Sequence, residues 1–158
     1  MTFGYQSARD FFEAARCAAQ ELERTERQIG RMRAAEGVRA QRYDVRGSGG
    51  GDVHGMGATD SRIDFEERMR RRMEEDRALV ARAVDVCYGD DGGVASLVGS
   101  HVADALYWRF CRAASWSAVA DAVCSSVKTA QRWCDVGLDT VDGVGVRRSI
   151  EGHGVAEG

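Results

Sequence analysis

The regular spacing of mostly apolar residues near the N-terminus limits the fold more than any other sequence feature. Between Ala8 and Gly37, seven such residues recur at alternating steps of three and four: Phe11, Ala15, Ala18, Leu22, Thr25, Ile29 and Met32. This spacing puts them on one face of an α-helix, in the pattern of a coiled-coil seam. The chain contains no proline, so no residue forces a break in a long helix. The pattern predicts a helix from Ala8 to Gly37, where the glycine would end it.

A second apolar stripe follows after a glycine-rich stretch. It consists of Phe65, Met69, Met73, Val80, Val84 and Cys87, and Asp76 interrupts it. It predicts a helix that begins at Thr59 or Asp60 and ends near Cys87 or Tyr88. Because neither narrow stripe would be stable as an isolated helix, we expect a long antiparallel helical hairpin, a coiled coil, over residues 1–88. The glycine-rich loop at 43–60 would close it, and a dimer of such hairpins is the alternative.

The glycines also suggest the domain boundaries. A cluster at residues 89–93 predicts a hinge. Residues 94–142 would then form a small helical domain, and residues 143–158 would form a flexible tail, because they are rich in glycine and polar residues. The expected fold class is therefore all-α.

The segment from Ser115 to Leu138 is typical of a helix-turn-helix. Ser115 can cap a first helix and Ser126 a second one, because a serine hydroxyl accepts a hydrogen bond from a free amide in the first turn. Small residues, Cys124 and Ser125, occupy the corner between them, as a tight two-helix turn requires. Two short amphipathic helices of this kind also occur in all-α domains that never bind DNA.

The second of these helices has an inward and an outward face. Ala130 and Trp133 would point into the domain. The residues expected to face DNA are Ser126, Val127, Lys128, Gln131 and Arg132. A recognition helix presents its N-terminal half to the major groove, where side chains of these types can contact bases or phosphates.

Residues 105–142 resemble the fourth conserved region of sigma factors, and more closely the small phage-encoded regulators of late transcription of the ArpU type. The matching positions are Arg109-Phe110, Ser115-Trp116, Val119-Ala120, Ser126, Thr129-Ala130, Arg132 and Gly137-Leu138. This chain departs from the pattern at Cys124, where glycine is usual, at Ser125, where an apolar residue is usual, and at Gly137, which weakens the helix end. The resemblance implies a helix-turn-helix transcription regulator encoded by a phage or prophage.

The charge distribution argues against a simple repressor. The chain has 22 basic and 25 acidic residues and a net charge of −3. Residues 101–142 hold four basic and five acidic side chains. Because basic side chains supply most non-specific affinity for DNA, we expect one copy to bind weakly. A homo-oligomer, or a complex with a partner such as RNA polymerase, fits this balance better.

Two other functions compete with transcription control. Small terminase subunits of DNA packaging also join a helix-turn-helix to an oligomerising coil. A protein-interaction module that binds RNA polymerase without touching DNA would tolerate the acidic balance.

The five cysteines lack the CxxC spacing of many metal and redox sites. We expect them to be reduced thiols that pack like small apolar residues. A zinc site built from His101, Cys111, Cys124 and Cys134 is conceivable, but the spacings match no zinc template. The sequence therefore predicts no metal and no cofactor.

No catalytic motif is present, so we expect the protein not to be an enzyme. The N-terminus lacks the features of a signal peptide, and no apolar run approaches the ~20 residues of a membrane span. These features predict a cytoplasmic protein that does not associate with a membrane.

Overall fold

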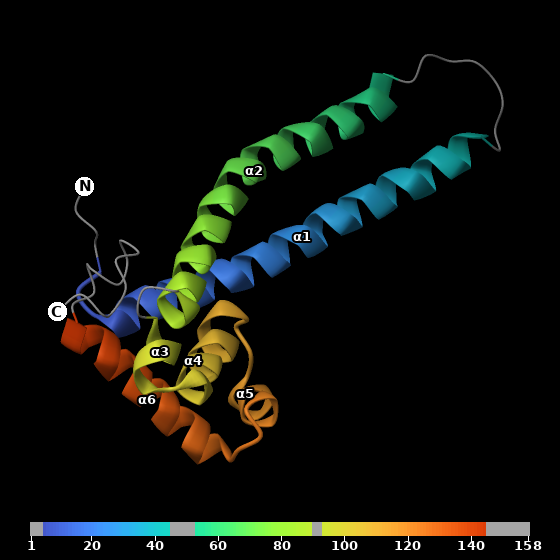
Figure 1. Ribbon diagram of the computed structural model, residues 1–158. Helices are drawn as coiled ribbons and strands as arrows, with labels where there is room; N and C mark the ends of the chain where they lie inside the picture. The colour runs from blue at the N-terminus through green and yellow to red at the C-terminus, as the bar shows by residue number, and fades with distance from the viewer. Residues whose placement is uncertain (1–4, 45–52, 90–92, 145–158) are drawn as a thin grey trace. The chain divides into compact units, whose positions relative to one another are not determined.

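The computed structural model describes residues 5–44, 53–89 and 93–144, and over these residues the protein is all-α. The elements are α1 (Ala8–Asp44), α2 (Val53–Tyr88), α3 (Val94–Val98), α4 (Ser100–Leu106), η1 (Tyr107–Cys111), α5 (Trp116–Ala122) and α6 (Val127–Val144). The segment η1 is π-helical. Figure 1 traces these elements in chain order. The fold class predicted from the sequence is confirmed.

The chain divides into two compact units, and the boundaries between them differ from the expected hinge at residues 89–93. The first, here the core unit, combines Met1–Gln20 with Asp76–Gly158, and the second, the hairpin unit, is Glu21–Glu75. Both ends of the expected 1–88 hairpin therefore lie in the same unit as the expected 94–142 domain. The reason is burial, because Phe11 in α1 and Val86 in α2 belong to the same apolar core as α3–α6.

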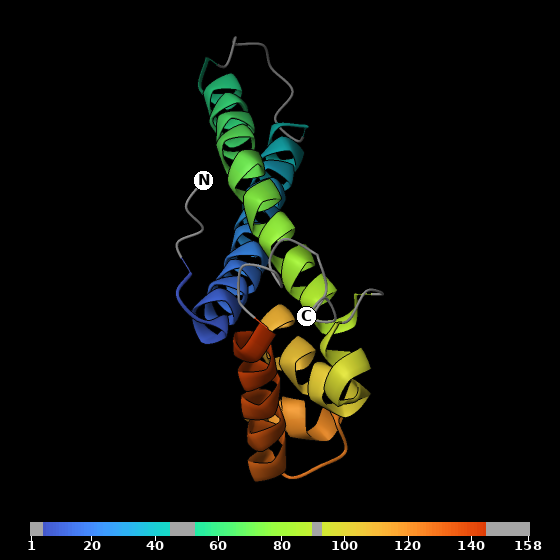
Figure 2. The same ribbon diagram turned by 60° about the vertical axis from the view of Figure 1, so that its left-hand side comes forward.

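In the core unit, α6 packs against α4 and α5 (Figure 2). Buried apolar residues from these helices form the core between them. Val102 and Leu106 of α4 and Phe110 of η1 are all buried. The helix widens at η1, where the Arg112 amide donates to the Tyr107 carbonyl five residues back. Within this π-helical turn, Phe110 and Cys111 are both buried.

The first turns of α1 complete this core. Phe11 and Phe12 are fully buried, and the Phe12 ring lies 5.5 Å from that of Phe110. The Ala8 amide, one of the free donors at the start of α1, donates to Asp142 Oδ1 at 2.7 Å. A carboxylate at this position both caps the helix and interacts favourably with its dipole.

Gly137 explains the close approach of α4 and α6. A Cβ atom at this position would lie 2.5 Å from Leu106 Cδ1 and 3.0 Å from Val102 Cγ1. Gly137 is buried in the middle of α6, so it does not mark a weakened helix end. The absence of a side chain here is what allows the two helices to pack so tightly.

In the hairpin unit, α1 and α2 are joined by cross-helix ion pairs. Arg33 Nε lies 3.0 Å from Glu66 Oε1, Arg62 pairs with Glu36, and Arg72 Nε lies 2.5 Å from Glu21 Oε1. As residue numbers rise along α1 in these pairs they fall along α2, so the two segments run antiparallel. Of the residues of this unit whose burial the structure describes, Thr25 and Met73 are buried. Coiled-coil packing along the whole predicted seam remains a prediction.

The ends of the long helices differ from the predictions. Helix α1 continues past Gly37 to Asp44, and α2 begins at Val53 rather than at Thr59 or Asp60. An exposed glycine costs only about 1 kcal/mol inside a helix, which the cross-helix pairs can offset. The expected 43–60 loop is correspondingly shorter, and residues 45–52 of it lie outside the described part of the chain.

The remaining glycine-rich segments fall largely outside the described residues. Residues 90–92 of the expected 89–93 hinge are among those left out, whereas the Gly93 amide donates to the Gly89 carbonyl at 3.0 Å. Of the expected 143–158 tail, Gly143 and Val144 belong to α6, and residues 145–158 lie beyond the last described residue.

Gly137→Ala should lower the free energy of unfolding by about 1–3 kcal/mol, because the new methyl group would overpack a buried contact. Gly143→Ala is the matched control, since it lies in the same helix and a Cβ atom added there would have no neighbour within 4 Å. It should be neutral or raise stability by up to about 1 kcal/mol. Urea titrations of both variants test this, and equal effects would contradict the close approach of α4 and α6.

Glu66→Gln should reduce the pH dependence of stability. The hydrogen bond from Arg33 lowers the pKa of the Glu66 carboxyl below its ordinary value of 4.5, and the bond from Arg62 adds to this. A lowered pKa in the folded state contributes stability above the unfolded-state pKa, and this stability is lost as pH falls through the folded-state pKa. Thermal unfolding should therefore show Glu66→Gln below wild type at pH 7 and close to it at pH 3. Exposed Glu67→Gln is the control and should follow wild type throughout.

Candidate nucleic-acid interface

Both predicted helix caps are present in the α5–α6 segment. Ser115 Oγ accepts from the Ala118 amide at 3.3 Å, and Ser126 Oγ accepts from the Thr129 amide at 3.1 Å. Each hydroxyl satisfies one of the free amides at the start of a helix. The two serines therefore fix where α5 and α6 begin.

The turn between α5 and α6 requires a left-handed residue. Cys124 has a φ of +52°, a conformation that glycine adopts without a steric penalty and that other residues adopt rarely. The Ser125 amide donates to the Ala120 carbonyl at 3.0 Å and closes the end of α5. The departure from the usual glycine at this position is therefore a source of strain.

Helix α6 turns one face to the core and the other to solvent. Ala130, Cys134 and Leu138 are buried, and half-buried Trp133 packs edge-on against His101 at 4.8 Å. The residues predicted to face DNA are all exposed: Ser126, Val127, Lys128, Gln131 and Arg132. They lie together in the first two turns of α6 and at its cap, and their contact with DNA remains a prediction.

Charge is distributed unevenly along α6. Lys128 and Arg132 lie in its N-terminal half and form no ion pair with any described residue. The acidic residues follow these two cations along the helix: Asp142 accepts from the Ala8 amide, and Asp135 Oδ1 lies 3.1 Å from Arg9 Nη2. Two of the acidic groups that weigh against DNA binding therefore already interact with α1, whereas the two cations do not have internal partners in the described chain.

Trp116, at the start of α5, packs against Arg109 from η1. The guanidinium carbon lies 4.3 Å from the indole centroid, and Nη1 donates to the Ala114 carbonyl at 3.0 Å. Burial lowers the pKa of the Arg109 guanidinium, and the positive charge of Arg16 lowers it further. The sequence pattern included Arg109 and Trp116 as separate positions but gave no sign that they stack or that Arg16 lies near them.

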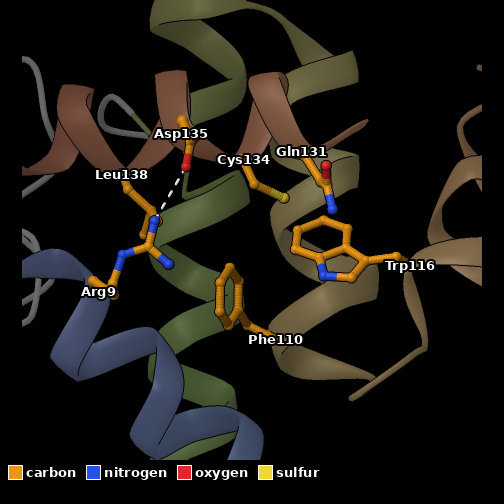
Figure 3. Close-up of a pocket in the computed structure, with 7 residues that line it drawn as sticks. All are labelled: Arg9, Phe110, Trp116, Gln131, Cys134, Asp135 and Leu138. Atoms are coloured by element: carbon orange, nitrogen blue, oxygen red, sulfur yellow. Dashed lines mark hydrogen bonds and ion pairs between the residues drawn. The ribbon is translucent and has the colours of Figure 1, made fainter. Parts of the chain in front are cut away.

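A pocket of about 220 Å³ lies beside the outward face of α6. It is lined by Arg9, Phe110, Trp116, Gln131, Cys134, Asp135 and Leu138. Figure 3 shows Trp116 and Gln131 on one side of it and the Arg9–Asp135 pair on the other. The sequence did not predict this pocket, because Arg9 lies 126 residues away from Asp135 along the chain.

The cysteines are all free thiols, but not all of them are buried. Cys87, Cys111 and Cys134 lie in the core, whereas Cys17 and Cys124 are exposed, contrary to the expectation that all pack as apolar residues. Burial raises the pKa of the Cys134 thiol to about 12. In the described part of the chain, no three His, Cys, Asp or Glu side chains are placed to hold a metal ion. None of the described helices is long and apolar enough to cross a bilayer.

No protein-family model, curated protein or solved structure matches the chain. The resemblance to sigma factor region four therefore rests on the matching residues alone. Function has to be argued from the surface of α6 and its surroundings.

Cys124→Gly should raise the free energy of unfolding by about 0.5–1 kcal/mol. Glycine removes the left-handed strain, about 1–2 kcal/mol, and loses part of that gain through the entropy of the unfolded chain. Cys124→Val should lower the free energy of unfolding, because a β-branched residue tolerates positive φ poorly. Urea unfolding of both variants measures the difference, and a glycine variant that is less stable than wild type would contradict the strained turn.

Proposed function

We propose that this protein binds double-stranded DNA through α6 and acts in transcription control, in a phage or prophage as the resemblance implies. The observation that carries the proposal is the outward face of α6, where Lys128 and Arg132 are exposed and form no ion pair within the described chain. Neutralising phosphates is the main source of affinity for DNA. On this surface the basic side chains form no ion pair within the described chain, whereas Asp135 and Asp142 interact with α1. The surface therefore suits DNA binding better than the net charge of the protein suggests.

The residues at the start of α6 have distinct roles in the proposed contact. Lys128 would neutralise a phosphate, and Gln131 could pair with adenine through its amide. Arg132 could reach guanine or a phosphate. Ser126 and Val127, at the N-terminal end of the helix, would lie closest to the bases or the adjacent backbone.

Assembly is part of the proposal, because one copy carries few cations at this surface. Val38 and Ile63 expose 53% and 42% of their surface on the hairpin unit, which supports association with a second copy or with a partner such as RNA polymerase. A homo-oligomer would present several copies of α6 to one duplex, and avidity would then exceed the affinity of each contact.

The double variant Lys128→Ala/Arg132→Ala should lose DNA binding. Fluorescence anisotropy with duplex DNA from upstream of its own gene should show a weakening of at least about tenfold at roughly 50 mM salt, since one good base contact contributes about 1–3 kcal/mol. Arg24→Ala/Arg31→Ala is the control. It removes the same charge from exposed positions of the hairpin unit and should bind as wild type does.

Equal binding by wild type and the α6 variant at every salt concentration would show that α6 does not contact DNA. A wild-type protein that assembles normally but binds no duplex would favour a protein-interaction module. Light scattering on the same samples gives the assembly size, and a ring of eight or more copies would favour a small terminase-like packaging subunit.

A further inference from the structure

The first turns of α1 carry two arginines that approach other helices of the core unit: Arg9 pairs with Asp135 of α6, and Arg16 lies near Arg109 of η1. Arg9 and Arg16 are seven residues apart, so they share one face of the helix and are separated by about 10 Å along its axis. Arg9 lines the pocket next to Gln131, on the side opposite Trp116 (Figure 3). Arg16 lies close enough to Arg109 to affect its pKa. Both arginines belong to the same compact unit as α6.

Arg9 is held at the outward face of α6. Its Nη2 atom lies 3.1 Å from Asp135 Oδ1, and both side chains are more than half exposed. An ion pair this exposed contributes little to stability. Its clearer consequence is electrostatic, because it cancels the acidic charge of Asp135 next to Arg132 and leaves the other guanidinium nitrogens of Arg9 near the face that would meet DNA.

Arg16 forms no ion pair with any described residue. The Nε atoms of Arg16 and Arg109 are both buried and have no hydrogen-bond partner among the described residues. Glu13 attracts Arg109 but forms no ion pair with a described side chain. Arg16 lowers the pKa of Arg109 by more than Glu13 raises it, so repulsion between the two guanidinium groups is only partly compensated, and a further anion bound against them would relieve the rest.

We propose that α1 makes a second contact with the DNA backbone, in which Arg16 binds a phosphate and Asp135 holds Arg9 toward the duplex. This inference rests on the proposed function, because it requires that α6 faces the same DNA. A planar guanidinium binds a phosphate through two parallel hydrogen bonds. A contact of this kind positions the protein on the duplex without reading its sequence.

The test compares three variants that each remove one positive charge from α1: Arg9→Gln, Arg16→Gln and, as control, exposed Arg24→Gln in the hairpin unit. Binding to the upstream duplex and to a random-sequence duplex is titrated between about 50 and 200 mM salt. Arg16→Gln should weaken both complexes about tenfold at the lowest salt concentration. It should also reduce the slope of log K against log salt by about 0.9, the value for one phosphate. Arg9→Gln should change both quantities in the same direction, and Arg24→Gln should change neither.

A second measurement separates a local contact from general electrostatics. Neutral methylphosphonate groups, placed one at a time along the duplex, should weaken wild type at a specific phosphate and leave Arg16→Gln unaffected there. Arg16→Lys should recover the salt slope with only part of the affinity. Circular dichroism and thermal unfolding check that every variant is folded.

The outcomes distinguish this inference from the proposed function. If wild type binds DNA while Arg9→Gln and Arg16→Gln match Arg24→Gln, the α1 contact is wrong and the role of α6 stands. If Arg16→Gln weakens binding but the α6 double variant does not, α1 contacts DNA and the assignment of α6 is wrong. If wild type binds no DNA at all, both proposals fail, and the exposed cations of α6, Lys128 and Arg132, would then suit an acidic protein surface.

Discussion

The burial of Phe11, Phe12 and Phe110 in one core is the interaction on which the rest of the structure depends. It joins the first turns of α1 to the helices that end the chain, and it places Ala8 against Asp142 and Arg9 against Asp135. Without α1, the apolar surface of η1 and α6 would face water, and two carboxylates of α6 would lose their partners. The α5–α6 segment therefore belongs to a larger core that includes the first turns of α1.

The same arrangement changes how the charge of this surface should be judged. A count over residues 101–142 gives an excess of one acidic group, which argues against DNA binding. The count leaves out α1, although its Ala8 amide interacts with Asp142 and its Arg9 side chain with Asp135. The count also ignores where each charged residue lies along α6. Lys128 and Arg132 lie together near the N-terminal end of that helix, whereas Asp135 and Asp142 lie farther along it. Local charge, rather than net charge, is the quantity that bears on function here.

Much of the local structure could be predicted from the sequence because it depends on nearby residues. Helical periodicity predicted that Ala130 and Trp133 face inward from α6, where the first is buried and the second half-buried, and serine chemistry predicted the caps at Ser115 and Ser126. Features that depend on distant residues could not be predicted. The sequence predicted that Gly137 weakens the end of a helix, whereas in the structure Leu106 and Val102 pack against it. The pocket beside Gln131 has Arg9 as one wall, and nothing in the spacing of either segment indicates their proximity. Helix α1 also continues past the exposed Gly37 to Asp44, because one glycine costs a helix only about 1 kcal/mol and does not by itself end it.

Because of its position within the chain, the hairpin unit could become longer or shorter in sequence without altering the core unit. Glu21–Glu75 is an insertion in the sequence of the core unit, which resumes at Asp76. The core therefore forms only after segments more than fifty residues apart meet, which slows folding more than it weakens the folded state. Once folded, the core unit constrains little of the inserted segment between its two parts. Whole turns could be added to or removed from both helices in step, so the reach of the hairpin could vary while the surface around α6 stays the same.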